Sequence, residues 1–261
     1  MVDDAQRVAL ITGATRGIGL AVTERLARED MRVFLCARSA DGVAETAKRL
    51  QDEGIDARGT SCDVTSSASV DAMVAEAVEA FGPIDVLVNN AGRSGGGPTA
   101  QITDELWLDV INTNLNSVFY VSRAVLTVGG MLDRGAGRII NIASTGGKQG
   151  VVLGAPYSAS KHGVVGFTKA LGLELAKTGV TVNAVCPGYV ETPMAQQVRG
   201  NYAKIWGISE DEVLQRFNAK IPLGRYTQPD EVAGLVHYLT SAGAAPITAQ
   251  ALNVCGGLGN Y

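Results

Sequence analysis

The chain has 261 residues, a formal net charge of −4 at pH 7 and 5% aromatic residues. A net negative charge and few aromatics argue against nucleic acid as the main partner. No apolar run approaches the ~20 residues that cross a bilayer, so no membrane association is expected. The acidic first residues lack the apolar core of a secretion signal.

The four cysteines are scattered along the chain without the spacing of a metal site. We expect buried free thiols, no bound metal and a reducing, cytoplasmic location. These cysteines are Cys36, Cys62, Cys186 and Cys255.

Short apolar runs alternate with helical patterns from one end of the chain to the other, with no linker or repeat between them. Such alternation predicts an α/β fold, a Rossmann-type doubly wound parallel sheet of about seven strands with helices on both faces. We expect one domain over residues 1–261. The runs are Val8–Ile11, Arg32–Cys36, Ile84–Asn89, Arg138–Ile142, Val180–Val185 and Ala251–Val254.

A glycine-rich turn follows the first run directly and opens a helix from Ile18 to about Arg28. Its glycines, Gly13, Gly17 and Gly19, have the spacing Gly-x-x-x-Gly-x-Gly. Glycines let the backbone approach a pyrophosphate, whose charge the helix N-terminus favours. An ordinary tight turn is the alternative, but this pattern after a strand is more selective than a lone G-x-G-x-x-G.

Tyr157 and Lys161 stand four residues apart in a predicted helix from Pro156 to about Lys177. That spacing puts the phenol and the ammonium on one helix face. A lysine beside a tyrosine is expected to lower the phenol pKa, which suits general acid–base chemistry. Ser144, at the end of a predicted strand, could hold a substrate oxygen.

Together these motifs resemble the short-chain dehydrogenase/reductase family over nearly the whole chain. The resemblance implies a catalytic set of Asn114, Ser144, Tyr157 and Lys161. Asn114, in a long helix from about Asp104 to Met131, would anchor a water of the proton relay. The matching motifs are Thr12-Gly13-x-x-x-Gly17-x-Gly19, Asp63-Val64, Asn89-Asn90-Ala91-Gly92, Asn114, Ser144, Tyr157-x-x-x-Lys161 and Pro187-Gly188.

NAD sites place an acid, which takes the ribose 2′-hydroxyl, at the end of the second strand. Here the second run is followed by Arg38 instead. Arg38 and Arg16 could pair with a 2′-phosphate, which favours NADP(H). Asp63 and Val64 would flank the adenine. The family pattern implies cofactor contacts from Gly13, Thr15, Arg16, Gly17, Ile18, Gly19, Arg38, Asp63, Val64, Asn90, Ala91, Gly92, Tyr157, Lys161, Pro187, Gly188, Val190 and Thr192.

The segment 191–220 carries apolar residues at the spacing of two amphipathic helices. It could pack on the core, form a mobile lid over a roomy substrate pocket, or do both. The residues expected to contact substrate are Ser94, Gly95, Gly96, Thr145, Gln149, Val151, Leu153, Met194, Tyr202 and Trp206.

Three stretches, 141–150, 155–163 and 253–261, look very like the ketoreductases of aromatic (type II) polyketide synthases, enzymes of antibiotic biosynthesis. The resemblance implies NADPH-dependent reduction of one carbonyl, typically that on the ninth carbon, of a poly-β-ketone tethered to acyl carrier protein. It also implies a homotetramer. The chain departs from the subfamily at Ser94, where a proline is frequent, and at Thr65, where a basic residue is frequent. Arg38 and Arg93 could form a basic rim for the acidic carrier protein.

Other functions share much of this pattern. A fatty-acid-type 3-oxoacyl-carrier-protein reductase would favour linear chains, and a free small-molecule ketone or alcohol dehydrogenase would need no carrier protein. A nucleotide-sensing regulator would be expected to lose Tyr157 or Lys161, and both are present.

Overall fold

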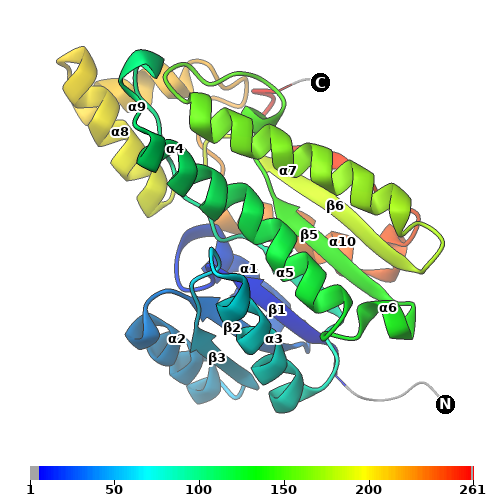
Figure 1. The fold of residues 1–261 in the computed structure, drawn as a ribbon. Helices are drawn as coiled ribbons and strands as arrows, with labels where there is room; N and C mark the ends of the chain where they lie inside the picture. The colour runs from blue at the N-terminus through cyan, green and yellow to red at the C-terminus, as the bar shows by residue number, and fades with distance from the viewer. Residues whose placement is uncertain (1–5, 260) are drawn as a thin grey trace.

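The computed structural model describes residues 6–259 and 261. Seven parallel strands form one sheet in the order β3-β2-β1-β4-β5-β6-β7 (Figure 1). The doubly wound sheet predicted from the alternating runs is therefore confirmed. The strands are β1 Val8–Thr12, β2 Arg32–Ala37, β3 Ala57–Ser61, β4 Val86–Asn89, β5 Gly137–Ile142, β6 Val180–Pro187 and β7 Ala251–Val254.

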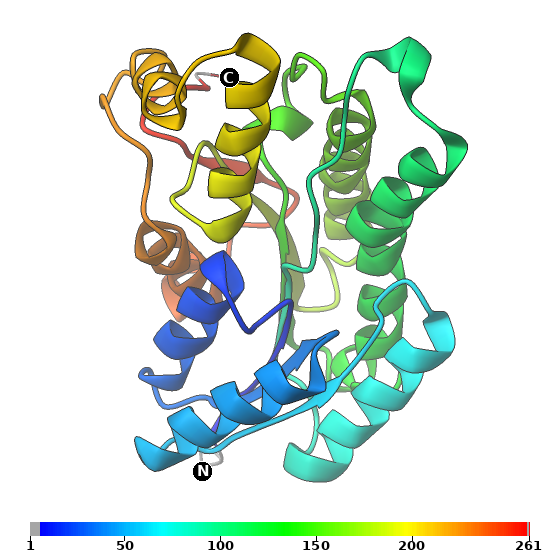
Figure 2. The same ribbon diagram turned by 90° about the vertical axis from the view of Figure 1, so that its left-hand side faces the viewer.

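Helices cover both faces of the sheet (Figure 2). Alternate residues of β1 point to opposite faces: Ala9 and Ile11 pack with α1, α2 and α10, whereas Val8 and Leu10 pack with α3, α5 and α7. The helices are α1 Gly17–Ala27, α2 Ala40–Asp52, α3 Ser67–Phe81, α4 Asp104–Ile111, α5 Ser117–Leu126, α6 Met131–Arg134, α7 Ala155–Glu174, α8 Pro193–Trp206, α9 Glu210–Asn218 and α10 Pro229–Thr240.

Five residues, Asn112–Asn116, form a π-helix between α4 and α5. The long helix expected from about Asp104 to Met131 therefore forms from Asp104 to Leu126 with the π turn inside it, and it ends about five residues earlier than expected. A π turn widens the helix by one residue and is common at functional sites. Short 3-10 helices complete the chain at Thr99–Gln101, Thr145–Gly147 and Ala242–Ala244.

The edge strand β3 was not among the predicted runs. Its sequence, Ala-Arg-Gly-Thr-Ser, has an alanine as its one apolar side chain and is mostly exposed or half-buried. It pairs with β2 over five residues. Outside the strands, α8 and α9 confirm the two amphipathic helices expected within 191–220.

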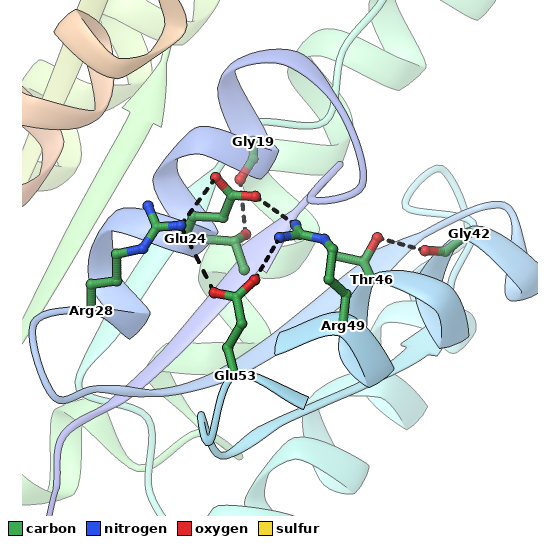
Figure 3. Close-up of polar contacts among 8 residues, drawn as sticks. Gly19, Glu24, Arg28, Gly42, Thr46, Arg49 and Glu53 are labelled. Atoms are coloured by element: carbon green, nitrogen blue, oxygen red, sulfur yellow. Dashed lines mark hydrogen bonds and ion pairs between the residues drawn. The ribbon is translucent and has the colours of Figure 1, made fainter. Parts of the chain in front are cut away.

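A ring of four charged side chains ties the C-terminal part of α1 to that of α2 (Figure 3). Arg49 pairs with both Glu24 and Glu53, and Arg28 lies 3.9 Å from each of the same carboxylates. Single exposed ion pairs contribute little to stability, but a connected network does better. The ring therefore holds the two helices that flank the start of β1 and β2 in a fixed relation.

Candidate active site

The carboxyl ends of the strands all lie at one edge of the sheet, and the lid helices α8 and α9 lie at the same end (Figure 1). Ligands of open parallel sheets bind in the crevice outside this edge. The expected site residues follow β1, β2, β3, β4, β5 and β6 in turn. The fold therefore brings the whole set to one edge.

The glycine turn has no room for side chains. Gly13 and Gly17 have φ angles of +65° and +56°, a region that favours glycine. A Cβ on Gly19 would overlap the carbonyl oxygen of Gly13 and the side-chain amide of Asn90. Helix α1 begins at Gly17 with no side chain capping its first N–H groups. This cradle fits a pyrophosphate, since backbone can approach closely and free N–H groups meet the charge.

Asn90 closes the turn from the neighbouring strand. Its side-chain amide donates to the carbonyl oxygens of Thr12 and Gly13, both at 3.0 Å, and the Thr12 hydroxyl accepts from the backbone of Asn90 and Ala91 at 3.0 Å. The amide hydrogens of Asn90 are therefore engaged in shaping the turn. Its expected place beside the adenosine ribose stays a prediction.

The residues expected to favour NADP(H) over NAD(H) and to contact the adenine lie near the ends of β2 and β3. Arg16 and Arg38 are both exposed, so their cations are free to meet a 2′-phosphate. The Asp63 carboxylate accepts from the backbone and hydroxyl of Thr65 at 3.0 and 2.7 Å. These bonds, and to a lesser degree the charge of Arg38, lower the pKa of Asp63. Asp63 is therefore an ionised acceptor, as an adenine amino group requires.

Ser144, Tyr157 and Lys161 converge beyond the end of β5. A Cβ built on Gly146 would lie 3.3 Å from both the Ser144 hydroxyl and the Tyr157 ring. Lys161 is buried, and its ammonium donates to the Ile142 carbonyl oxygen at 2.8 Å and lies 5.9 Å from the centre of the Tyr157 ring. The structure therefore brings together the three side chains that the sequence placed apart.

The expected lowering of the Tyr157 pKa is wrong for this structure. Desolvation raises the pKa of the phenol, and the neighbouring Ser144 hydroxyl opposes the shift only in part. Desolvation also lowers the pKa of Lys161 to about 8. Burial penalises the charged form of each group. Tyr157 therefore retains its proton at neutral pH.

Asn114 is fully buried in the π-helix. Its oxygen accepts from the backbone N–H of Arg93 at 2.8 Å, and its amide donates to the Arg93 carbonyl at 3.0 Å and to the Ser160 hydroxyl at 3.1 Å. The side chain thus joins the loop after β4 to the catalytic helix α7. The expected water anchor stays a prediction, because both amide hydrogens are already donated within the protein.

Arg93 does not form the free basic rim that the sequence suggested. Its guanidinium pairs with the Asp109 carboxylate on α4, and its Nε donates to the Ser94 carbonyl at 3.1 Å. The pairing cancels its charge locally. The sequence showed no sign of this partner, because Asp109 is sixteen positions away on another element.

The lid begins directly above the glycine turn. A Cβ on Gly17 would lie 3.3 Å from the methyl group of Thr192, whose hydroxyl caps α8 by accepting from Ala195 N–H at 3.2 Å. Arg199 on α8 makes a bidentate pair with Glu191 at 2.8 and 2.9 Å. Near them Gly188 donates to the Val254 carbonyl, and Val190 is buried. The base of the lid therefore borders the cofactor cradle.

The upper part of the lid is an aromatic cluster. The Tyr189 ring stacks on Phe217 at 4.8 Å and on Tyr226 at 5.2 Å, while Tyr202 packs against Trp206 at 4.8 Å and Phe217 at 5.3 Å. The lid thus has a small core of its own, with Val213 and Phe217 buried. Both uses foreseen for the segment are compatible with this arrangement.

The residues expected to contact substrate lie on the loops after β4 and β5 and on the lid helix α8. Val151 packs on Gly146, and a Cβ on Gly96 would overlap the Leu153 carbonyl oxygen. Met194 and Trp206 are each 38% exposed on α8. Thr145 is buried, while Gln149 is exposed. Contact with substrate stays a prediction for all ten.

Two functional positions escaped the sequence reasoning. Ser160 links Asn114 to the catalytic helix by donating to the Tyr157 carbonyl at 2.7 Å. The Lys148 ammonium donates to the Ala251 carbonyl at 2.9 Å and to the Asn253 side chain at 3.0 Å, which ties the loop after Ser144 to β7. The one sign of these roles in the sequence is that Ser160 and Lys148 stand close to the motif residues along the chain.

Two hollows of about 250 and 310 Å³ lie away from this edge, one at the amino ends of β1 and β5 and one between α1 and α10. Neither contains a residue of the catalytic set. Within residues 6–259 and 261, no helix is long and apolar enough to cross a membrane. The same residues hold no cluster of three or more side chains suited to a metal ion.

Residues 7–203 match the family model for short chain dehydrogenases. The chain belongs to the short chain dehydrogenase family. It is 63% identical over 261 residues, all of both chains, to a putative ketoacyl reductase of Streptomyces coelicolor. It is 66% identical over the same length to the monensin polyketide synthase putative ketoacyl reductase of Streptomyces virginiae. At 38% identity over 252 residues, 97% of each chain, it matches a 3-oxoacyl-[acyl-carrier-protein] reductase of Escherichia coli.

Among solved structures, a variant of actinorhodin polyketide ketoreductase crystallised with NADPH matches with a TM-score of 0.97 and 63% identity over all of both chains. These findings confirm the family and the subfamily resemblance read from the motifs. As a short chain dehydrogenase, the chain is an oxidoreductase acting between carbonyl and hydroxyl groups.

Proposed function

We propose that this protein is an NADPH-dependent ketoreductase of a polyketide synthase. The observation that carries the proposal is the convergence of Ser144, Tyr157 and Lys161 on one spot beside a pyrophosphate cradle. The identity of 63–66% to ketoacyl reductases, two of them named as parts of polyketide synthases, supports the substrate class.

The fit of the cofactor rests on the cradle and its surroundings. The glycine turn would hold the pyrophosphate, and Arg16 and Arg38 would pair with the 2′-phosphate, since no acid at the end of β2 repels it. Lys161 and Asn90 face the same edge. When bound, NADPH supplies a hydride to the carbonyl carbon.

The chain's own residues hold and protonate the substrate oxygen. Ser144 and Tyr157 donate hydrogen bonds to the carbonyl oxygen, and these bonds strengthen as negative charge develops there. Tyr157 gives its phenol proton to the oxygen as the hydroxyl forms. The ammonium of Lys161 stabilises the phenolate that remains.

The finer proposal is that the substrate is a poly-β-ketone tethered to acyl carrier protein and reduced at the ninth carbon. It is supported by the polyketide synthase relatives and by the aromatic lid beside the catalytic tyrosine. Of the two arginines suggested for carrier docking, Arg93 is paired with Asp109, and Arg38 is assigned here to the 2′-phosphate. We further propose a homotetramer located in the cytoplasm, where the four buried free thiols would stay reduced.

The test is NADPH oxidation by the purified protein with trans-1-decalone, a fused-ring ketone, beside a linear β-ketoacyl thioester. We expect a clear preference for the fused-ring ketone. Preference for the linear thioester would favour the second candidate, a fatty-acid-type reductase, to which the 38% identical relative points. Turnover of neither ketone by a protein that binds NADPH would overturn the proposed reaction.

A further inference from the structure

A short strap of four residues, Val151–Gly154, connects the walls of the substrate cleft. Each of its carbonyl oxygens accepts one hydrogen bond from a different source. The Val151 carbonyl accepts from Gly154 N–H at 2.9 Å within the strap, and the Gly154 carbonyl accepts from Ser158 N–H at 2.8 Å on the catalytic helix. The strap is therefore fixed to the helix that carries Tyr157.

The other two carbonyls reach across to the facing walls. The Leu153 carbonyl accepts from Gly97 N–H at 2.8 Å, in the loop after β4. The Val152 carbonyl accepts from the Tyr202 hydroxyl at 3.0 Å, on the lid helix α8. Of the bonds to these two walls, only the one to the lid comes from a side chain, so it alone can open by side-chain rotation.

The strap is held in an unfavourable conformation. Leu153 has a φ of +58°, in the left-handed region that costs a residue other than glycine or asparagine ~1–2 kcal/mol. Val152 is 79% exposed, so its own side chain contributes little packing. Bonds to neighbouring elements must therefore keep the strap in place.

Tyr202 moves with the lid rather than with the strap. Its ring packs against Trp206 and Phe217, both on the lid helices α8 and α9. Its hydroxyl is thus presented to the strap by the lid's aromatic cluster. The Tyr202–Val152 bond joins two bodies that are otherwise anchored separately, α8 through Arg199 and the strap through Ser158 and Gly97.

The strap that accepts this bond begins beside the catalytic centre. Val151, at one end of the strap, lies against Gly146, and a Cβ built on Gly146 would lie 3.3 Å from both Ser144 and Tyr157. A ketone whose oxygen meets Ser144 and Tyr157 would therefore lie close to the strap. A strap tied to the lid leaves less room beside that ketone than a strap that is free of it.

We propose that Tyr202 is a specificity-determining latch, whose bond to the Val152 carbonyl sets the width of ketone that the cleft admits. This inference rests on the proposed ketoreductase function. Narrow ketones enter beneath the closed latch, and fused-ring ketones enter only after the bond breaks. Tyr202 acts by its hydroxyl, whereas the sequence had assigned it only a substrate contact.

The test is Tyr202→Phe, which keeps the ring and removes the hydroxyl. The ratio of kcat/KM for trans-1-decalone to that for cyclohexanone should rise about 3- to 10-fold, the equivalent of one hydrogen bond. Tyr238→Phe is the matched control, because Tyr238 is 47% exposed on α10, far in sequence from the lid and the strap, and should leave the ratio unchanged. An unchanged or lowered ratio in Tyr202→Phe overturns the latch.

Hydrogen exchange gives a second readout that does not depend on turnover. The amides of the strap and of α8 around Tyr202 should exchange faster in Tyr202→Phe, while those of β1 and β4 keep their rates. Unchanged exchange in strap and lid overturns the latch whatever the kinetics show. Loss of turnover with both ketones, with NADPH still bound, would instead count against the proposed function.

Discussion

The glycine turn and the lid border the same cleft but are held by different means. The turn packs tightly against main-chain atoms: a Cβ on Gly19 has no space, and the side chains of Thr12 and Asn90 bond to main-chain atoms. Beyond its base, the lid is held mainly between side chains, through the Arg199–Glu191 pair, an aromatic cluster and one tyrosine hydroxyl. The cofactor side therefore has little room to adjust, whereas the substrate side can change by rotation of a few side chains.

The largest expected effect separates chemistry from cofactor binding. Tyr157→Phe should lower kcat by about 10²- to 10⁴-fold, because the proton donor is lost. Fluorescence titration should find NADPH affinity close to that of the original protein, since the cradle does not involve the phenol. Turnover near the original rate would refute the assignment of Tyr157.

Breaking the ion pair at the lid base should loosen the lid alone. Arg199→Met leaves Glu191 without its partner in a site where Arg199 is only 9% exposed. The free energy of opening α8, measured by hydrogen exchange, should fall by roughly 2–3 kcal/mol, less than for a fully buried pair because Glu191 is partly exposed. Arg225→Met, which breaks the exposed pair with Glu231, is the control and should leave the opening of α8 unchanged. Equal effects of the two variants would contradict the comparison.

The glycine turn should lose NADPH affinity on substitution, whereas the lid would tolerate a change. Gly19→Ala should weaken NADPH binding roughly 10-fold or more, because an added methyl forces Gly13 and Asn90 apart. Gly234→Ala on α10 adds the same methyl to open space and should leave NADPH binding unchanged. Isothermal titration of both variants would settle the point, and an unaffected Gly19→Ala would show that the turn is not the cradle.

The smallest effect is on pH dependence. The pKa of Lys161 is lowered to about 8 by burial, so between pH 8 and about 10 the unfolded chain binds more protons than the folded one. Stability from this residue therefore rises with pH in that window, by up to ~1.4 kcal/mol per pH unit. Above pH 10 the raised pKa of Tyr157 acts in the opposite direction. When stability is measured by urea unfolding, Lys161→Met should not show this rise with pH. A pH profile of stability identical to that of the original protein would refute the prediction.

How much could be predicted from sequence differs between the two regions. The turn and the catalytic triplet could be placed because their function demands fixed residue types at fixed spacing, as in Gly13–Gly19 and Tyr157–Lys161. The sheet followed from apolar runs, apart from β3, whose polar edge sequence lacks that pattern. The local spacing of residues was thus sufficient to predict the glycine turn, the catalytic triplet and most of the sheet.

What could not be predicted depends on contacts between distant elements. The pairing of Arg93 with Asp109, the π turn around Asn114 and the left-handed Leu153 leave no mark in local sequence. The direction of the Tyr157 pKa shift was missed because spacing shows the lysine but not the burial of both groups. The lid helices were foreseen, but the bond from Tyr202 to Val152 was not.

The attachment of Lys148 to β7 has a consequence for biosynthesis. Chains emerge from the ribosome amino end first and begin to fold as they emerge. The glycine turn and its partners in β1, α1 and Asn90–Ala91 all lie within the first 91 residues. The contacts that tie the Ser144 loop to β7 form only when Ala251 and Asn253 arrive to meet Lys148. The residues of the nucleotide cradle are thus synthesised long before those that secure the catalytic loop.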